Sequence, residues 1–258
     1  MKRKKQWGDV TVGNEIRFRR VLLKLSGEAI ADKKTGEIFD SGIIDKIAGI
    51  VKRLTDDGVE VAIVIGAGNI WRGVYGKGLN RARADEMGML GTMINSMRME
   101  DALETAGCKV TLMSSIPMQG FAEPYDFRKA RRHLEKGKVV ILGGGLGTPF
   151  ITTDTAAVVR GGEIGADVIL MAKNIDGIYT SDPRKDSTAK RFKTVSYDEC
   201  LSKNLRATDA SASAIAKDQK VDMYVFGLDD PENIVRAVYG EEIGTLVTHD
   251  GNIKSELY

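Results

Sequence analysis

Three continuous apolar runs in this chain each end in a glycine-rich turn. The runs are Val21–Leu25, Val61–Ile65 and Val139–Leu142, and the turns are Ser26-Gly27, Gly66-Ala-Gly68 and Gly143-Gly-Gly145-Leu-Gly147. Unbroken Val, Ile and Leu runs are typical of parallel strands, because helices cover both faces of such a sheet. Glycine at the end of a strand lets bare backbone N–H groups approach an anion. The pattern therefore predicts a sheet edge that holds several phosphates.

The rest of the chain continues this alternation of strands and helices. Strand-like runs recur near 20–25, 60–65, 109–113, 139–142, 167–171, 221–226 and 245–248. Helix-like stretches fall at 41–56, 85–106, 126–136, 153–164, 208–217 and 231–238, and polar loops at 31–39 and 174–193. We expect an α/β protein, a three-layer αβα sandwich with a mostly parallel central sheet. Met87, Met93 and Met97 share one helical stripe and are expected in the core.

The expected domain organisation is simple. A polar N-terminal extension covers 1–19, and a single domain covers 20–258, with a division near residue 160 into two lobes of one sheet. The chain of 258 residues is long enough for one large α/β domain.

The composition narrows the classes of protein to consider. Lys and Arg (38) nearly balance Asp and Glu (36), so we expect no extended nucleic-acid surface. No apolar stretch approaches the ~18 residues that span a bilayer. Cys108 and Cys200 have neither metal nor disulfide spacing, and no apolar core follows the basic start Met1–Lys5. We therefore expect the cytoplasm and no membrane.

Lys24 stands in the middle of the first apolar run. Side chains alternate along a strand, so Lys24 shares a face with Leu22 and Ser26. A lone lysine in a strand is usually an edge residue that reaches solvent. The first strand of an α/β sheet is usually covered, however, and Gly27 follows closely. We therefore favour a cation that neutralises phosphate oxygens.

Asp154 follows the third glycine turn, within Thr152-Thr-Asp-Thr155. Thr153 or Asp154 is expected to cap the helix over 153–164. A carboxylate at this helix start is also suited to hold Lys24 or to orient a metal–phosphate complex. Asp209 opens a later helix and is more typical of a cap than of a catalytic group.

Two further side chains have a functional and an ordinary interpretation. Arg72 follows the second glycine turn and is either a bidentate phosphate clamp or a solvated loop residue. Tyr179, in the polar stretch 174–193, either stacks on a nucleobase or packs on the sheet. The chain contains no P-loop of the GxxxxGKS or GxxxxGKT type, and its glycine turns break the GxGxxG pattern. A nucleotide enzyme with this sequence needs another phosphate cradle.

From about Arg20 to Thr248 the chain resembles the amino-acid kinase family. The family motifs are Lys24-Leu-Ser-Gly27-Glu, Ile65-Gly-Ala-Gly-Asn69, Thr152-Thr-Asp154 and Asp176-Gly-Ile-Tyr-Thr-Ser-Asp182-Pro. Motifs similar to those of its bacterial uridylate (UMP) kinase branch are Asn69-Ile-Trp-Arg72-Gly, Asn80-Arg81, Asp85-Glu-Met-Gly-Met-Leu-Gly-Thr-Met-Ile-Asn95 and Met99-Glu-Asp101-Ala-Leu. The resemblance implies the amino-acid kinase fold and transfer of the ATP γ-phosphoryl group to UMP in pyrimidine nucleotide biosynthesis.

The resemblance also implies a role for each matching position. The catalytic residues would be Lys24 and Asp154. The ATP-binding residues would be Lys24, Leu25, Ser26, Gly27, Gly68, Arg72, Tyr179 and Asp182. The UMP-binding residues would be Ala67, Asp85, Leu146, Gly147, Thr148, Pro149, Phe150, Ile151, Thr152 and Thr153. About 20–160 would form the UMP lobe and about 161–258 the ATP lobe. A family member would use Mg²⁺ bound mainly through ATP phosphates, form a homohexamer, and respond to GTP as activator and UTP as inhibitor.

The chain departs from the family pattern at several of these positions. Ala67 replaces a common glycine, Leu146 and Thr148 stand where Thr and Asn are frequent, and Ile151 replaces an aromatic residue. Lys173-Asn174 also differs from common variants, and we assign no role there. Two alternatives stay open: an amino-acid or carbamate kinase of the same fold, and a non-catalytic nucleotide-binding or storage protein. Arg72 and Asp85 argue against the first, because a small amino acid offers them neither phosphate nor ribose.

Overall fold

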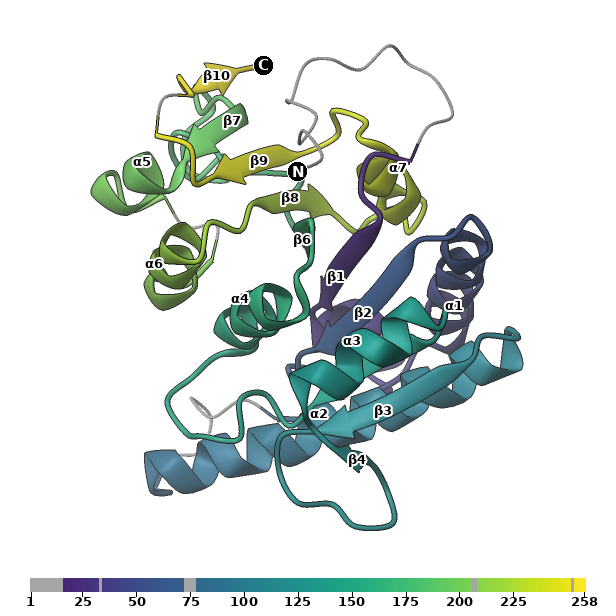
Figure 1. Ribbon diagram of the computed structural model, residues 1–258. Helices are drawn as coiled ribbons and strands as arrows, with labels where there is room; N and C mark the ends of the chain where they lie inside the picture. Colours follow the sequence, from purple (N-terminus) through teal and green to yellow (C-terminus); the bar gives the residue numbers. More distant parts are fainter. Residues whose placement is uncertain (1–15, 33, 72–77, 206–207, 252) are drawn as a thin grey trace.

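The computed structural model describes residues 16–32, 34–71, 78–205, 208–251 and 253–258. These residues form one ten-stranded sheet in the order β10-β7-β9-β8-β6-β1-β2-β5-β3-β4 (Figure 1). The strands are β1 Arg20–Leu25, β2 Glu60–Ile65, β3 Val110–Ser114, β4 Glu123–Pro124, β5 Val139–Gly143, β6 Val168–Lys173, β7 Phe192–Ser196, β8 Met223–Gly227, β9 Thr245–Thr248 and β10 Glu256–Leu257. The pairs β8–β9 and β7–β10 are antiparallel, and the other strand pairs are parallel.

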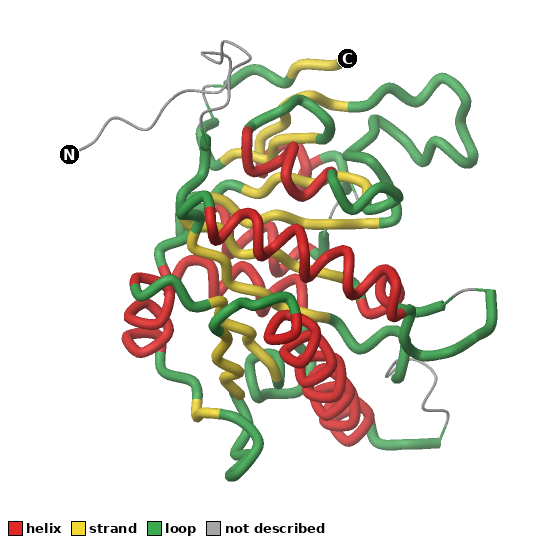
Figure 2. The backbone as a smooth tube through the Cα atoms, turned by 90° about the vertical axis from the view of Figure 1, so that its right-hand side faces the viewer, coloured by secondary structure: helices red, strands yellow, loops and turns green. Residues whose placement is uncertain are grey.

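Helices cover both faces of this sheet, which confirms the three-layer α/β fold (Figure 2). They are α1 Ser41–Asp56, α2 Arg81–Thr105, α3 Phe127–Glu135, α4 Thr153–Ile164, α5 Tyr197–Ser202, α6 Ala210–Asp218 and α7 Asn233–Tyr239, with a 3₁₀ turn η1 at Gly27–Ile30. Buried side chains of α1, α2 and α7 pack on one face, and those of α3, α4, α5 and α6 on the other. The side chains of β1 therefore alternate between the two helix layers: Leu23 packs against the first layer and Leu22 against the second.

The strand order brings separate parts of the chain to one edge. β1 lies in the middle of the sheet, with β2 on one side and β6 on the other, and all three are parallel. Their carboxyl ends therefore lie at the same edge of the sheet. Strands β2 to β5 all lie on one side of β1, and the chain then crosses to the other side to form β6. In open α/β sheets, ligands bind at the carboxyl edge beside such a crossing.

Several elements differ from the sequence expectations. α2 begins at Arg81, four residues earlier than expected, because the Asn80 side chain caps it by accepting a hydrogen bond from Ala82 N (2.9 Å). β7 and α5 were not expected, since β7 lies at the end of a polar stretch and pairs with β9 from much later in the chain. Met93 is buried as expected, but Met87 and Met97 are exposed on the outer face of α2.

Candidate active site

The most buried charged group at this edge is Lys24, which is 6% exposed. Its Nζ lies 2.7 Å from Oδ1 of Asp154, at the start of α4. Oδ2 of the same carboxylate lies 2.5 Å from Nζ of Lys173, the last residue of β6. Two strands and one helix thus bring two ammonium groups to one carboxylate, a cluster that we call the lysine–aspartate centre.

The local structure explains how Asp154 reaches this position. The residue that caps α4 is Thr152, not Thr153 or Asp154 as expected: Thr152 Oγ1 accepts a hydrogen bond from Thr155 N (3.2 Å). Because Thr152 satisfies the helix start, the carboxylate of Asp154 is available to the lysines. Asp154 also lies in the first turn of α4, where the helix dipole favours a negative charge.

The electrostatics of the centre favour ionised partners. Burial opposes the charged form of Asp154, but the ammonium groups of Lys24 and Lys173 outweigh it and hold the pKa of this carboxyl at about 2. Burial lowers the pKa of Lys24, and Asp154 counteracts this effect. The three groups of the centre carry a surplus positive charge, which suits a phosphate group, and the nearby carboxylate of Asp209 offsets part of it.

The two glycine turns beside this centre are packed against each other. A Cβ added at Gly27 would contact Oδ1 of Asn69 and lie 2.5 Å from the carbonyl oxygen of Gly66 and 2.7 Å from the nitrogen of Gly68. Asn95, which is fully buried, donates hydrogen bonds from Nδ2 to the Gly66 carbonyl (2.6 Å) and to Asn69 Oδ1 (2.7 Å). The turns are therefore fixed before any ligand arrives, and their N–H groups are available as a phosphate cradle.

A cavity of about 110 Å³ lies between the start of α2 and the third glycine turn. Its lining includes the expected residues Ala67, Asp85, Leu146, Thr148, Ile151 and Thr153, together with Ala84, Gly88, Met89, Thr92 and Gly145. Oδ2 of Asp85 accepts a hydrogen bond from Phe150 N (2.9 Å), and its other partner is Arg81 Nε at 3.0 Å. The cavity thus has a carboxylate at one side, and its wall mixes apolar side chains with those of Thr92, Thr148 and Thr153.

A match to a protein family agrees with this geometry. A model of the amino acid kinase family matches residues 19–227. The chain belongs to the amino acid kinase family.

Solved structures agree closely with the family assignment. The chain is similar to a UMP kinase from Bacillus anthracis, with 40% identity over 93% of this chain and 99% of that chain and a TM-score of 0.89. It is also similar to a UMP kinase from Ureaplasma parvum, with 31% identity over 90% and 100% of the two chains and a TM-score of 0.85. A uridylate kinase from Archaeoglobus fulgidus has 26% identity over 88% and 99%, with a TM-score of 0.68.

Other expected positions of this amino acid kinase are not among the residues that line the cavity or form the lysine–aspartate centre. Phe150 is 67% exposed and has a positive φ of 70°. Tyr179 donates to Asp176 Oδ1 (2.8 Å), and Asp182 accepts from Arg184, so both are bonded within the β6–β7 connection. Gly147 and Pro149 do not line the cavity. Arg72 lies outside the described residues.

Sequence reasoning missed two side chains at this site. Lys173 received no role, although it ends an otherwise apolar strand, the same signal that singled out Lys24. Asp209 caps α6 as expected, accepting from Ala212 N (2.7 Å), but it also accepts hydrogen bonds from Thr152 Oγ1 and from Thr155 Oγ1 (2.9 Å). It therefore ties the start of α4 to α6.

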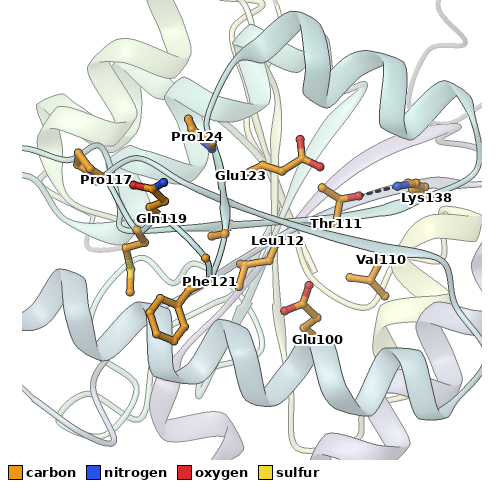
Figure 3. A pocket seen from close by; sticks show the side chains of 13 residues that line it. Glu100, Val110, Thr111, Leu112, Pro117, Gln119, Phe121, Glu123, Pro124 and Lys138 are labelled. Carbon is orange, nitrogen blue, oxygen red and sulfur yellow. Dashed lines mark hydrogen bonds between the residues drawn. The ribbon is translucent and has the colours of Figure 1, made fainter.

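A larger hollow of about 750 Å³ lies between α2 and the strands β3 and β4 (Figure 3). It contains none of the expected site residues. Glu100 and Glu123 line it, and burial together with the neighbouring Glu104 raises the pKa of Glu100. The ammonium of Lys138 donates to Thr111 Oγ1 (3.0 Å). Two carboxylates disfavour a phosphate here, so this hollow is a weaker candidate for the reaction site than the smaller cavity.

No cluster of three or more His, Cys, Asp or Glu side chains suited to a metal ion is found among the described residues. No helix in the described part of the chain is long and apolar enough to cross a membrane.

Proposed function

We propose that this chain is a UMP kinase that transfers the γ-phosphoryl group of ATP to UMP, giving UDP and ADP. The observation that carries the proposal is the lysine–aspartate centre, which lies at the carboxyl edge of the sheet beside the glycine turns. The family match and the similarity to UMP kinases over nearly the whole chain support the same reaction. A product of this kind belongs to pyrimidine nucleotide biosynthesis.

Phosphoryl transfer of this type needs two anions held in line rather than a covalent intermediate. A phosphate oxygen of UMP attacks the γ-phosphorus of ATP, and ADP leaves with the electron pair of the broken P–O bond. Lys24 would neutralise the charge on the transferring group, and Leu25, Ser26, Gly27 and Gly68 would cradle the ATP phosphates through backbone N–H groups. Each preorganised donor of this kind lowers the activation barrier by roughly 3–4 kcal/mol.

Asp154 acts through the lysines rather than on the substrate in this proposal. Both of its oxygens accept hydrogen bonds from ammonium groups, and Asp209 is bonded to threonine hydroxyls, so these carboxylates offer a metal ion no free pair of oxygens. We therefore write the donor substrate as MgATP, with the magnesium held mainly by the phosphate oxygens.

The resemblance to the family assigns a binding role to each of the two lobes, and the cavity supports the role of the first. We assign 20–160 to UMP and 161–258 to ATP, after a polar extension at 1–19. Asp85 would accept hydrogen bonds from the ribose hydroxyls, and the segment 146–153 with Ala67 would enclose the nucleotide. On the donor side, Arg72, Tyr179 and Asp182 would lie beside ATP.

We also propose a homohexamer in the cytoplasm, with GTP as activator and UTP as inhibitor. The resemblance to bacterial UMP kinases supports this assembly and these effectors. An exposed apolar stripe on α2, made of Met87, Leu90, Ile94 and Met97, supports self-association, because residues at this spacing share one helix face. Neither a nucleic acid nor a membrane takes part in the reaction.

The test is ADP release, measured in a coupled assay with ATP and Mg²⁺. UMP, CMP, dTMP, acetylglutamate and carbamate are offered separately. We expect release with UMP alone, and this would show that Leu146 and Thr148 permit selection of uracil. Turnover with acetylglutamate or carbamate instead would replace the substrate while keeping the fold. If no acceptor leads to ADP release, a non-catalytic nucleotide-binding protein would be favoured.

A further inference from the structure

Arg160 is a buried charged residue of α4 that belongs neither to the cavity lining nor to the lysine–aspartate centre. It is 7% exposed, and its guanidinium carbon lies 3.7 Å from the centre of the Tyr125 ring. Its Nη1 donates to Glu163 Oε2 (2.7 Å), which also accepts from the Tyr125 hydroxyl (2.6 Å). Among the described residues, no group accepts a hydrogen bond from its Nε. A buried N–H without a partner costs free energy, so stability alone does not account for a guanidinium here.

The other nitrogen of the guanidinium fork points toward the third glycine turn. Nη2 of Arg160 donates to Ser115 Oγ (2.8 Å), and this hydroxyl donates in turn to the carbonyl oxygen of Gly145 (2.8 Å). Ser115 directly follows β3, and Gly145 lines the cavity that contains Asp85. A continuous chain of hydrogen bonds therefore runs from α4 through Ser115 to the wall of this cavity.

The third glycine turn also packs closely on the backbone of Ser115. Gly145 and Gly147 both have positive φ, and a Cβ added at Gly147 would lie 2.7 Å from the Ser115 carbonyl oxygen. Hydrogen bonds in series polarise one another, so a hydroxyl that accepts from a guanidinium donates more strongly. Ser115 thus fixes the Gly145 carbonyl, and Arg160 fixes the direction of the Ser115 hydroxyl. The chain of bonds acts at the start of the turn, so its later residues can still adjust to a nucleotide.

We propose that Arg160 is a positioning residue for the acceptor nucleotide, which acts through Ser115 on the Gly145 wall of the cavity and so sets the affinity for UMP. The inference rests on the proposed function for its acceptor, UMP. Arg160 lies on α4, whose first turn carries Asp154, so one helix aligns the cavity wall with the lysine–aspartate centre. Neither Arg160 nor Ser115 touches the substrate, and no step of the transfer passes through them.

A purely structural role is the alternative, in which Arg160 only ties α4 to the segment after β3. Ser115→Ala removes the connecting hydroxyl and leaves Arg160 its contacts with Glu163 and Tyr125. Arg160→Met removes the charge and the fork, and Arg160→Lys keeps the charge without the fork. Ser202→Ala, at an exposed position of α5 outside the cavity lining, removes the same hydroxyl and is the matched control.

The experiment measures kcat and the separate KM values for UMP and MgATP, the UMP affinity by calorimetry, and thermal melts. For Ser115→Ala we expect KM and Kd for UMP to rise about tenfold, while kcat and KM for ATP change less than about threefold. Arg160→Met should show the same rise, Arg160→Lys should recover part of the affinity, and Ser202→Ala should match wild type.

A double variant tests whether Arg160 acts through Ser115. If it does, Ser115→Ala combined with Arg160→Met should bind UMP no more weakly than Arg160→Met alone, because the second substitution removes a connection that is already broken. Multiplied losses in the double variant would overturn the proposal. If Arg160→Met fails to fold, Arg160→Lys takes its place in this comparison.

A Kd for UMP in Ser115→Ala within about threefold of wild type would also overturn the proposal, as would equal rises in KM for UMP and ATP. A wild-type chain that binds UMP but transfers no phosphoryl group would reject the proposed function, and calorimetry on the variants would still decide the role of Arg160. A wild-type chain that binds no UMP would reject both.

Discussion

Asp154 and Asp85 are almost equally buried, with side chains 13% and 15% exposed, but they are held in different ways. Asp154 gives each oxygen to a lysine from a central strand. Asp85 accepts one backbone N–H and one arginine, and that arginine is itself 60% exposed. Equal burial thus hides a difference in rigidity, because the partners of Asp154 come from two strands of the sheet, and the partners of Asp85 are a loop N–H and a solvated side chain.

The difference reflects the elements that build the two regions. The lysine–aspartate centre comes from β1, β6 and α4, which are fixed by the sheet and its core. One wall of the acceptor cavity comes from a connection with positive φ at Gly145, Gly147 and Phe150, and the opposite wall from α2. Loops of this kind are ordered by few buried contacts, so substrate binding can reshape them. We infer that the phosphoryl end is preorganised and that the acceptor end is completed by UMP.

The largest expected effect on turnover is at the lysine–aspartate centre. Lys24→Ala should lower kcat roughly a hundredfold or more, because a preorganised cation is lost from the transferring group. The fold should persist, since Asp154 keeps its ion pair with Lys173. ADP release and a thermal melt measure the two effects, and Lys24→Met controls for the packing of the side-chain stem. Near-normal turnover would remove Lys24 from the mechanism.

Asp154→Asn should break the centre itself. The pKa of Asp154 is depressed from 3.8 to about 2, so its charge contributes stability above pH 3.8 that is lost as the pH falls toward 2. This shift corresponds to about 2 kcal/mol, and the variant also leaves two lysines without their anion. We expect a loss of roughly 2–4 kcal/mol at pH 7, measured by urea unfolding.

The pH dependence provides the control for this prediction. The difference in unfolding free energy between wild type and Asp154→Asn should shrink as the pH falls from 4 to 2, since the wild-type carboxyl then becomes protonated. A difference that stayed constant over this range would show that Asp154 does not stabilise the fold through its charge.

Gly27→Ala tests the packing of the glycine turns. The new methyl group would lie 2.5 Å from the Gly66 carbonyl oxygen, so the two turns must separate. We expect a loss of about 1–3 kcal/mol in stability and weaker ATP binding. Gly49→Ala in α1 is the matched control, because nothing lies within 4 Å of its added methyl group, and it should stabilise the protein slightly. Equal behaviour of the two variants would contradict the rigid cradle.

The smallest effect is expected at the acceptor end. Asp85→Asn should raise KM for UMP about tenfold and change kcat much less, because it weakens hydrogen bonds to the ribose but leaves the lysine–aspartate centre intact. Its stability should match wild type, since the lost bonds are to Phe150 N and a solvated arginine. Glu86→Gln, one residue along the same helix, serves as control. A large drop in kcat with unchanged KM would show that Asp85 acts in phosphoryl transfer rather than in UMP binding.

Much of the fold and part of the site follow from local patterns in the sequence. The apolar runs at β1, β2 and β5, interrupted only by Lys24, are typical of a covered parallel sheet, and the glycines after them mark its ligand edge. Lys24 stood out because a charge in such a run needs a partner. The structure does give it one in Asp154. The resemblance to the amino-acid kinase family rested on the same residues.

Only the tertiary structure decided which side chains meet. Lys173 had the same local signature as Lys24, but its role depends on β6 lying next to β1, a neighbour chosen by long-range packing of the whole sheet. Met97 lies four residues after Met93, but it shares the outer face of α2 with Leu90 and Ile94 and is exposed, whereas Met99 and Leu103, further along the same helix, are buried. Periodicity and glycine act within a few residues, so the sequence determines elements and edges. The strand order depends on many weak contacts across the entire core, and it determines which side chains meet at the site.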